Sequence, residues 1–162
     1  MSPAARVRPL GPDDVVRCLA IVRGLPEFFT PDVAETVRLD AERDRAWVVE
    51  DGDGVMGFAV VEGRSRDAAE ILWAAVDAER RGAGLGTQLV ESVLGTLREE
   101  GVRLVEVKTL DRSAGYPPYE ATRAFWERRG FVHVDTIDPF PGWQAGNPAA
   151  LYVAALAPTR GA

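Results

Sequence analysis

The chain has 162 residues, of which 46% are hydrophobic, and it carries a formal net charge of −6 and a single cysteine. This length and apolar content suffice for one domain with a buried core, which we expect to extend over residues 1–162. The negative charge argues against a nucleic-acid partner and favours a cationic ligand, while the lone Cys18 excludes an internal disulfide and suits a reducing compartment.

No segment predicts export or membrane insertion. Residues 1–6 contain no apolar signal core. The longest apolar run, residues 149–157, is far shorter than the roughly 18 residues that span a bilayer. The sequence therefore predicts a cytoplasmic protein with no membrane partner.

Short strands and helices alternate along the chain, without a linker or an internal repeat. In the first half, the hydrophobic spacing predicts a strand, two helices and a two-stranded hairpin. In chain order these are residues 7–10, 12–22, 32–41, 46–49 and 55–61. Thr30 or Asp32 caps the second helix. Between the two helices, residues 25–31 interrupt the pattern with three apolar side chains that look exposed.

The second half continues with a strand, a long helix, a strand, a turn-rich loop, a helix and two closing strands. In chain order these are residues 70–76, 87–100, 102–109, 111–118, 119–129, 131–137 and 151–155. Gly101 and Gly130 end the two helices. The alternation predicts a mixed α/β domain.

The segment from residue 70 to residue 101 is the most informative, because an apolar strand enters a glycine-rich turn that opens a helix. At the start of a helix the first backbone N–H groups have no intrahelical partner and the helix dipole is positive, so a phosphate is stabilised there. Glycines let the backbone approach the anion closely, Arg81 adds a cation, and the Thr87 hydroxyl can reach a phosphate. The residues of this predicted anion site are Arg81, Gly82, Ala83, Gly84, Leu85, Gly86 and Thr87.

Three kinds of phosphate-binding loop share this form. A P-loop has a Lys followed by Ser or Thr after its last glycine, and no Lys follows Gly86, which excludes it. A dinucleotide fingerprint requires a third glycine where Thr87 stands, and its acidic residue, about 20 residues further on, would be Glu106 in the middle of a predicted strand. The third pattern, Arg/Gln-x-x-Gly-x-Gly/Ala after a strand ending in Val, is met in full from Arg81 to Gly86. It resembles the acetyl-CoA loop of the GNAT superfamily of N-acetyltransferases.

A second segment carries the same resemblance. Residues 119–131 look like the closing helix of the family, in which an aromatic pair, here Phe125 and Trp126, is followed by a few polar residues and then Gly-Phe. The order of elements matches as well, so the resemblance covers nearly the whole chain. It implies a single α/β GNAT domain with a mixed, mostly antiparallel sheet of about six to seven strands and about four flanking helices. It also implies that acetyl-CoA binds as co-substrate in the splay between the strands at Ile71 and Leu104, with Trp126 among its contacts.

The resemblance further suggests a catalytic base. An amine with a pKa near 10.4 is an ammonium ion at neutral pH, so a base must remove a proton before the nitrogen attacks the thioester. In the histone acetyltransferase branch of the family, a glutamate six residues before the closing aliphatic residue of the strand has this role, and Glu70 stands there. Strand alternation predicts that every second residue shares its face: Leu72, Ala74 and Val76. The alternative is a solvated glutamate at a strand end.

The oxyanion of the tetrahedral intermediate needs a hydrogen-bond donor. In the family this donor is a backbone N–H near the end of the same strand, which here means Ala75 or Val76, at a bulge that opens the ladder. The alternative for these two residues is ordinary strand pairing.

One position departs from the family pattern. The second residue of the aromatic pair is usually a Tyr that protonates the departing CoA thiolate, whereas Trp126 has an indole, which cannot deliver a proton at neutral pH. Tyr119 and Tyr116, in and just before the same helix, are candidates for the acid, directly or through water. Their alternative role is packing.

The acceptor is not identified by the sequence beyond a small-molecule or peptide amine. Aromatic residues on loops and helix ends are candidates for lining its pocket. These are Phe28, Phe29, Tyr116, Tyr119 and Trp143. The only histidine, His133, has no clustered ligands, so no metal site is predicted, and we expect a monomer or homodimer. A non-catalytic acyl-CoA sensor or interaction module with a degenerate site is the alternative function, and Trp126 is the feature that favours it.

Overall fold

The computed structural model describes residues 4–158. Residues 1–3 and 159–162 lie outside this range. The predicted domain of residues 1–162 is therefore described without its two ends, and the N-terminal segment 1–6 without its first half. No helix of the described range is long and apolar enough to cross a bilayer.

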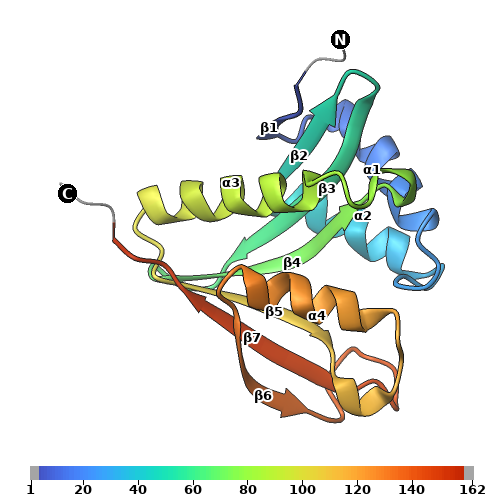
Figure 1. Ribbon diagram of the computed structural model, residues 1–162, viewed down its shortest axis with the longest axis vertical. Helices are drawn as coiled ribbons and strands as arrows, with labels where there is room; N and C mark the ends of the chain where they lie inside the picture. The colour runs from blue at the N-terminus through green and yellow to red at the C-terminus, as the bar shows by residue number, and fades with distance from the viewer. Residues whose placement is uncertain (1–3, 159–162) are drawn as a thin grey trace.

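A seven-stranded sheet forms the centre of the molecule (Figure 1). The strand order is β1-β2-β3-β4-β5-β7-β6, and every neighbouring pair is antiparallel except β4 and β5. The strands are β1 Arg6–Pro9, β2 Arg45–Asp51, β3 Gly54–Gly63, β4 Ala68–Val76, β5 Leu104–Leu110, β6 Val132–Ile137 and β7 Ala149–Ala155. The α-helices are α1 Val15–Arg23, α2 Val33–Arg43, α3 Leu85–Glu99 and α4 Tyr119–Arg128. The predicted mixed sheet with four flanking helices is confirmed.

Helices cover both faces of this sheet, as Figure 1 shows. The long helix α3 buries Leu89, Val90, Val93 and Leu97 against one face, in a cluster that also contains Trp126 of α4. Each such side chain contributes about 1.5–3 kcal/mol when fully buried. Helices α1 and α2 pack on the opposite face in a second cluster. The sheet therefore separates two layers of helices, with α3 and α4 on one face and α1 and α2 on the other.

The parallel strands β4 and β5 pair over four rungs only, from Ala68 opposite Leu104 to Ile71 opposite Val107. Beyond that rung β4 continues to Val76 and β5 to Leu110, and Figure 1 shows the two strands running apart. Within residues 4–158, the edge of β4 that faces β5 consequently has no ladder partner from residue 72 onward. This is the predicted splay.

A bulge in β4 changes which side chains share a face. The register of β4 with β3 shifts so that Val60 opposes Trp73 and Val61 opposes Ile71, which leaves Leu72 unpaired. A single extra residue reverses the alternation of side chains beyond it. Ala74 packs in the α3 cluster, whereas Leu72 and Trp73 pack in the α1–α2 cluster.

Two predictions about β4 are therefore wrong. Ala74 and Val76 do not share the face of Glu70, because the bulge intervenes and both pack with α3. The bulge is not at Ala75 or Val76 either, since these residues pair regularly with Phe58 and Gly57 of β3. The extra residue is Leu72, three positions earlier than Ala75.

Candidate active site

The glycine-rich turn lies at the N-terminus of α3, as predicted. Gly82 and Gly84 have φ of +81° and +80°, a conformation that a residue with a side chain adopts only under strain. Gly84 is the N-cap of α3 and has no side chain to cap the helix, so the first N–H groups of α3 have no side-chain acceptor from it. A Cβ built at Gly84 meets no atom within 4 Å, so it would point into open space. An anion can approach the backbone through that space.

The entrance to this turn is fixed by Asp77, the residue after β4. Its Oδ1 accepts a hydrogen bond of 2.9 Å from the backbone N–H of Glu79, and its Oδ2 lies 2.6 Å from Nη2 of Arg17 on α1. These contacts lower the pKa of Asp77 below its ordinary value, the backbone hydrogen bond first, although partial burial opposes the shift. Asp77 is therefore an ionised anchor that ties the turn to α1 at neutral pH.

Two cations flank the turn, and the sequence revealed one of them. Arg81 has no carboxylate within ion-pair distance in the described range, and its guanidinium lies 4.5 Å from the centre of the Phe28 ring. Arg129, just after α4, donates a hydrogen bond from Nη2 to the Thr87 hydroxyl. Its Nε is buried and has no hydrogen-bond partner among the residues that the structure describes. The sequence does not reveal Arg129, because no local pattern marks a contact between residues 42 positions apart.

The remaining turn residues offer backbone rather than side chains. Leu85 is 7% exposed and belongs to the α3 cluster, and a Cβ at Gly86 would contact the Phe125 ring at 3.5 Å. Ala83 is exposed. Leu85 and Gly86 can therefore bind a phosphate only through their N–H groups.

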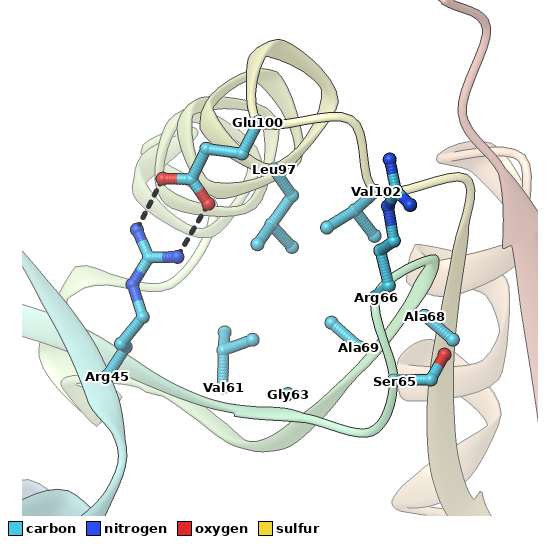
Figure 2. Close-up of a pocket in the computed structure, with 10 residues that line it drawn as sticks. All are labelled: Arg45, Val61, Gly63, Ser65, Arg66, Ala68, Ala69, Leu97, Glu100 and Val102. Carbon is cyan, nitrogen blue, oxygen red and sulfur yellow. Dashed lines mark hydrogen bonds and ion pairs between the residues drawn. The ribbon is translucent and has the colours of Figure 1, made fainter.

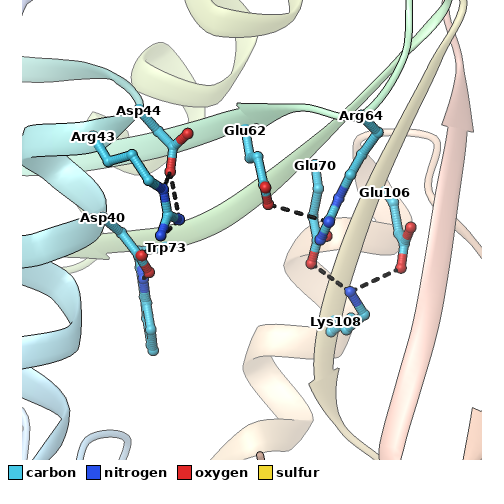
Figure 3. A network of polar contacts seen from close by, with 9 residues as sticks. All are labelled: Asp40, Arg43, Asp44, Glu62, Arg64, Glu70, Trp73, Glu106 and Lys108. Carbon is cyan, nitrogen blue, oxygen red and sulfur yellow. Dashed lines mark hydrogen bonds and ion pairs between the residues drawn. The ribbon is translucent and has the colours of Figure 1, made fainter. Parts of the chain in front are cut away.

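Glu70 is buried in a network of charges on the α1–α2 face of the sheet, which Figure 3 shows. The residue is 3% exposed, its Oε1 accepts a hydrogen bond of 2.6 Å from Lys108 Nζ, and its Oε2 accepts one from Arg64. Glu62 pairs with the same arginine at 3.2 Å, and Glu106 pairs with the same lysine at 3.2 Å. The alternative of a solvated strand-end glutamate is wrong, because β5 places a lysine beside the carboxylate.

The two tyrosines suggested as acids are both hydrogen-bonded to the loop between α1 and α2. Tyr119 donates to the backbone oxygen of Phe28 at 3.0 Å, and Tyr116 donates to that of Glu27 at 2.9 Å. Burial raises the pKa of Tyr119 above its ordinary value, and Tyr116 adds to the shift. Both hydroxyl protons are thus engaged by backbone carbonyl groups, which argues against either tyrosine as the acid.

Trp126 is a core residue in this structure. It is 6% exposed and packs edge-on between Phe125 and Phe131, with both ring centres 5.1 Å away. Its prediction as a cofactor contact is not supported by this position, because the indole fills the α3–α4 layer. Its presence in the sequence needs no explanation beyond packing.

The aromatic residues proposed to line the acceptor pocket fall into separate groups. Phe28 packs between Arg81 and Tyr119, with its ring centre 5.2 Å from that of the tyrosine. Phe29 approaches Trp73 of β4 at 6.1 Å. Trp143, in the loop between β6 and β7, packs at 5.8 Å against Phe140, which in turn covers Lys108.

A cavity of about 230 Å³ lies elsewhere, at the C-terminal end of α3 (Figure 2). Leu97 and Val102 form part of its wall, and an ion pair of 2.6 Å between Arg45 and Glu100 closes one side. Because Gly84 starts the same helix, this cavity is separated from the glycine-rich turn by the length of α3. No cluster of three or more potential metal ligands occurs within residues 4–158.

Comparison with known proteins supports one family. The model of the acetyltransferase (GNAT) domain matches residues 42–133. No curated protein sequence matches the chain. Among solved structures, a GNAT-family protein from Desulfovibrio desulfuricans is similar over 95% of this chain and 100% of its own, with 24% identity and a TM-score of 0.83.

Two further structures show the same fold. The ribosomal-protein-S18-alanine N-acetyltransferase from Escherichia coli is similar over 98% of this chain and 97% of its own, with 18% identity and a TM-score of 0.79. A GNAT family acetyltransferase from Elizabethkingia anophelis, with acetyl-CoA bound, is similar over 94% of this chain and 98% of its own, with 17% identity and a TM-score of 0.69. The matched family model, which spans more than half of the chain, places this protein in the GNAT acetyltransferase family.

Proposed function

We propose that the chain transfers the acetyl group of acetyl-CoA to a primary amine by direct attack of the amine on the thioester. The observation that carries this proposal is the arrangement around the β4–β5 splay. An exposed glycine-rich turn lies at the N-terminus of α3, and a buried glutamate lies at the last paired rungs of β4 and β5, on the other face of the sheet. Donor and acceptor can therefore approach the splay from opposite sides.

The donor side would be held by backbone and cations. The N–H groups at the start of α3, together with Arg81 and Arg129, suit a pyrophosphate, because N–H dipoles and guanidinium groups both stabilise it. The free edge of β4 beyond Leu72 offers N–H and C=O groups to an extended amide-containing chain, as an unpaired strand edge does for a peptide. A backbone N–H on this edge would also donate to the oxyanion.

On the acceptor side, Glu70 would take the proton from the ammonium group of the acceptor. Acetyl-CoA supplies the thioester carbonyl that the amine then attacks. Because both tyrosine hydroxyls are engaged, solvent would protonate the departing thiolate, and a thiol with a pKa near 8.5 tolerates this. The E. coli relative is named for acting on an alanine and the Elizabethkingia structure contains acetyl-CoA, which supports this pairing of donor and acceptor.

Release of CoA thiol from acetyl-CoA, measured over a panel of polyamines, aminoglycosides, amino acids and peptide amines, tests the proposal. We expect acceptor-dependent thiol release for at least one amine class, above the rate of hydrolysis without acceptor. Calorimetry with acetyl-CoA accompanies the assay. Acetyl-CoA binding without thiol release for any amine would instead identify a non-catalytic acyl-CoA sensor.

A further inference from the structure

Lys108 is the only lysine in the chain, and it lies at the base of the splay. It follows Val107, the last residue of β5 that pairs with β4. Its Nζ is 2.6 Å from Oε1 of Glu70 and 3.2 Å from Oε1 of Glu106. The protein thus carries a primary amine of its own, hydrogen-bonded to the carboxylate that we assign as the base.

The surroundings hold this amine in place. Glu70 and Glu106 are direct neighbours across the β4–β5 ladder, so their carboxylates flank Nζ from adjacent strands. The ring of Phe140 covers Nζ at 5.3 Å, and the lysine side chain is 17% exposed. Nζ is therefore fixed at the proposed acceptor position and shielded from reagents in bulk solvent.

We propose that Lys108 is a site of self-acetylation, an inference that rests on the proposed function. In the first step a proton passes from Nζ to Oε1 of Glu70 along the existing hydrogen bond, and the free amine attacks the thioester carbonyl. The N–C bond forms, the C–S bond breaks, the departing thiolate takes a proton from solvent, and the nitrogen loses its second proton to solvent. Glu70 returns its proton to solvent, so the products are acetyl-lysine, CoA thiol and one proton.

The modification changes the charge beside the base. Acetyl-lysine has no ammonium group and forms no ion pair. Glu62 and Glu70 would then keep their ion pairs with Arg64, whereas Glu106 would lose the ion pair that it forms with Lys108. An external ammonium ion would meet a more negative site after self-acetylation than before it.

Peptide mapping tests the proposal directly, because trypsin cleaves after Arg103, Lys108 and Arg112 but not after acetyl-lysine. Purified protein is incubated with acetyl-CoA, and samples are digested over time. We expect the uncleaved peptide 104–112 to accumulate with the added mass of one acetyl group. Its rate should not depend on protein concentration, since the reaction is intramolecular.

Two variants serve as controls. Lys108→Arg keeps a cation beside Glu70 and removes the only lysine of the chain. Any acetyl group found on this variant would therefore lie on the N-terminal amine. Gly84→Val disrupts the anion site and leaves Lys108 intact, and it should abolish the modification.

Calorimetry on the same samples distinguishes the two possible failures. If acetyl-CoA binds and Lys108 stays fully cleavable, the self-acetylation proposal is overturned while the proposed function stands. Equal modification of Gly84→Val would also overturn it, because it would indicate chemical acetylation. A rate that falls on dilution would overturn it as well, because it would indicate transfer between molecules. If acetyl-CoA does not bind, both proposals fall.

Discussion

Replacing Glu70 with Gln is expected to lower turnover at neutral pH by about a hundredfold or more, the usual contribution of a general base. Glutamine keeps the size and hydrogen-bonding reach of the side chain but cannot accept the proton of the ammonium group. Activity should recover in part at high pH, where the free amine accumulates. Acetyl-CoA affinity should not change, since Glu70 lies on the acceptor face of the sheet.

The matched control is Glu62→Gln. It removes a carboxylate from Arg64, which also pairs with Glu70, but leaves the proposed base in place. A loss of activity that comes from disturbing the ion-pair network should therefore appear in both variants. A loss that comes from removing the base should appear in Glu70→Gln alone. Full-rate turnover by Glu70→Gln with the pH profile of the parent protein would assign Glu70 to structure alone.

Gly84→Val is expected to weaken acetyl-CoA binding by at least about tenfold, because each charge-assisted hydrogen bond from the backbone contributes about 1.5–3 kcal/mol. The valine side chain would fill the open space that the anion requires, and φ of +80° forces strain on any residue with a Cβ. Calorimetry with CoA and acetyl-CoA measures the loss.

A glycine at the other end of the same helix provides a control for the effect of backbone strain alone. Gly101 has φ of +91°, and a Cβ there also meets no atom within 4 Å. Gly101→Val should therefore lose a similar amount of stability in thermal unfolding and retain its affinity for CoA. If the two variants bound CoA equally well, the glycine-rich turn would not be part of the CoA site.

Local features of this protein could be read from the sequence. The glycine-rich turn, the helix after it and the positive φ at Gly101 follow from residues within a few positions of one another. The same holds for the alternation of strands and helices. Where the local structure depends on neighbours in the chain, the prediction is confirmed.

Features that depend on distant partners could not be read in this way. The bulge at Leu72 is a property of the pairing between β3 and β4, and it placed Ala74 and Val76 on the face opposite to the one predicted. Lys108 reaches Glu70 across 38 positions and Arg129 reaches Thr87 across 42. A lysine that is the only one in its chain was nonetheless a signal available in the sequence.

A crystal structure of this chain in complex with acetyl-CoA would show directly whether the cofactor binds at the glycine-rich turn and in the splay. We expect the pyrophosphate on the N–H groups between Gly84 and Thr87, and the thioester in the splay beside Leu72. Density for the ligand elsewhere, such as in the cavity at the C-terminal end of α3, would contradict it.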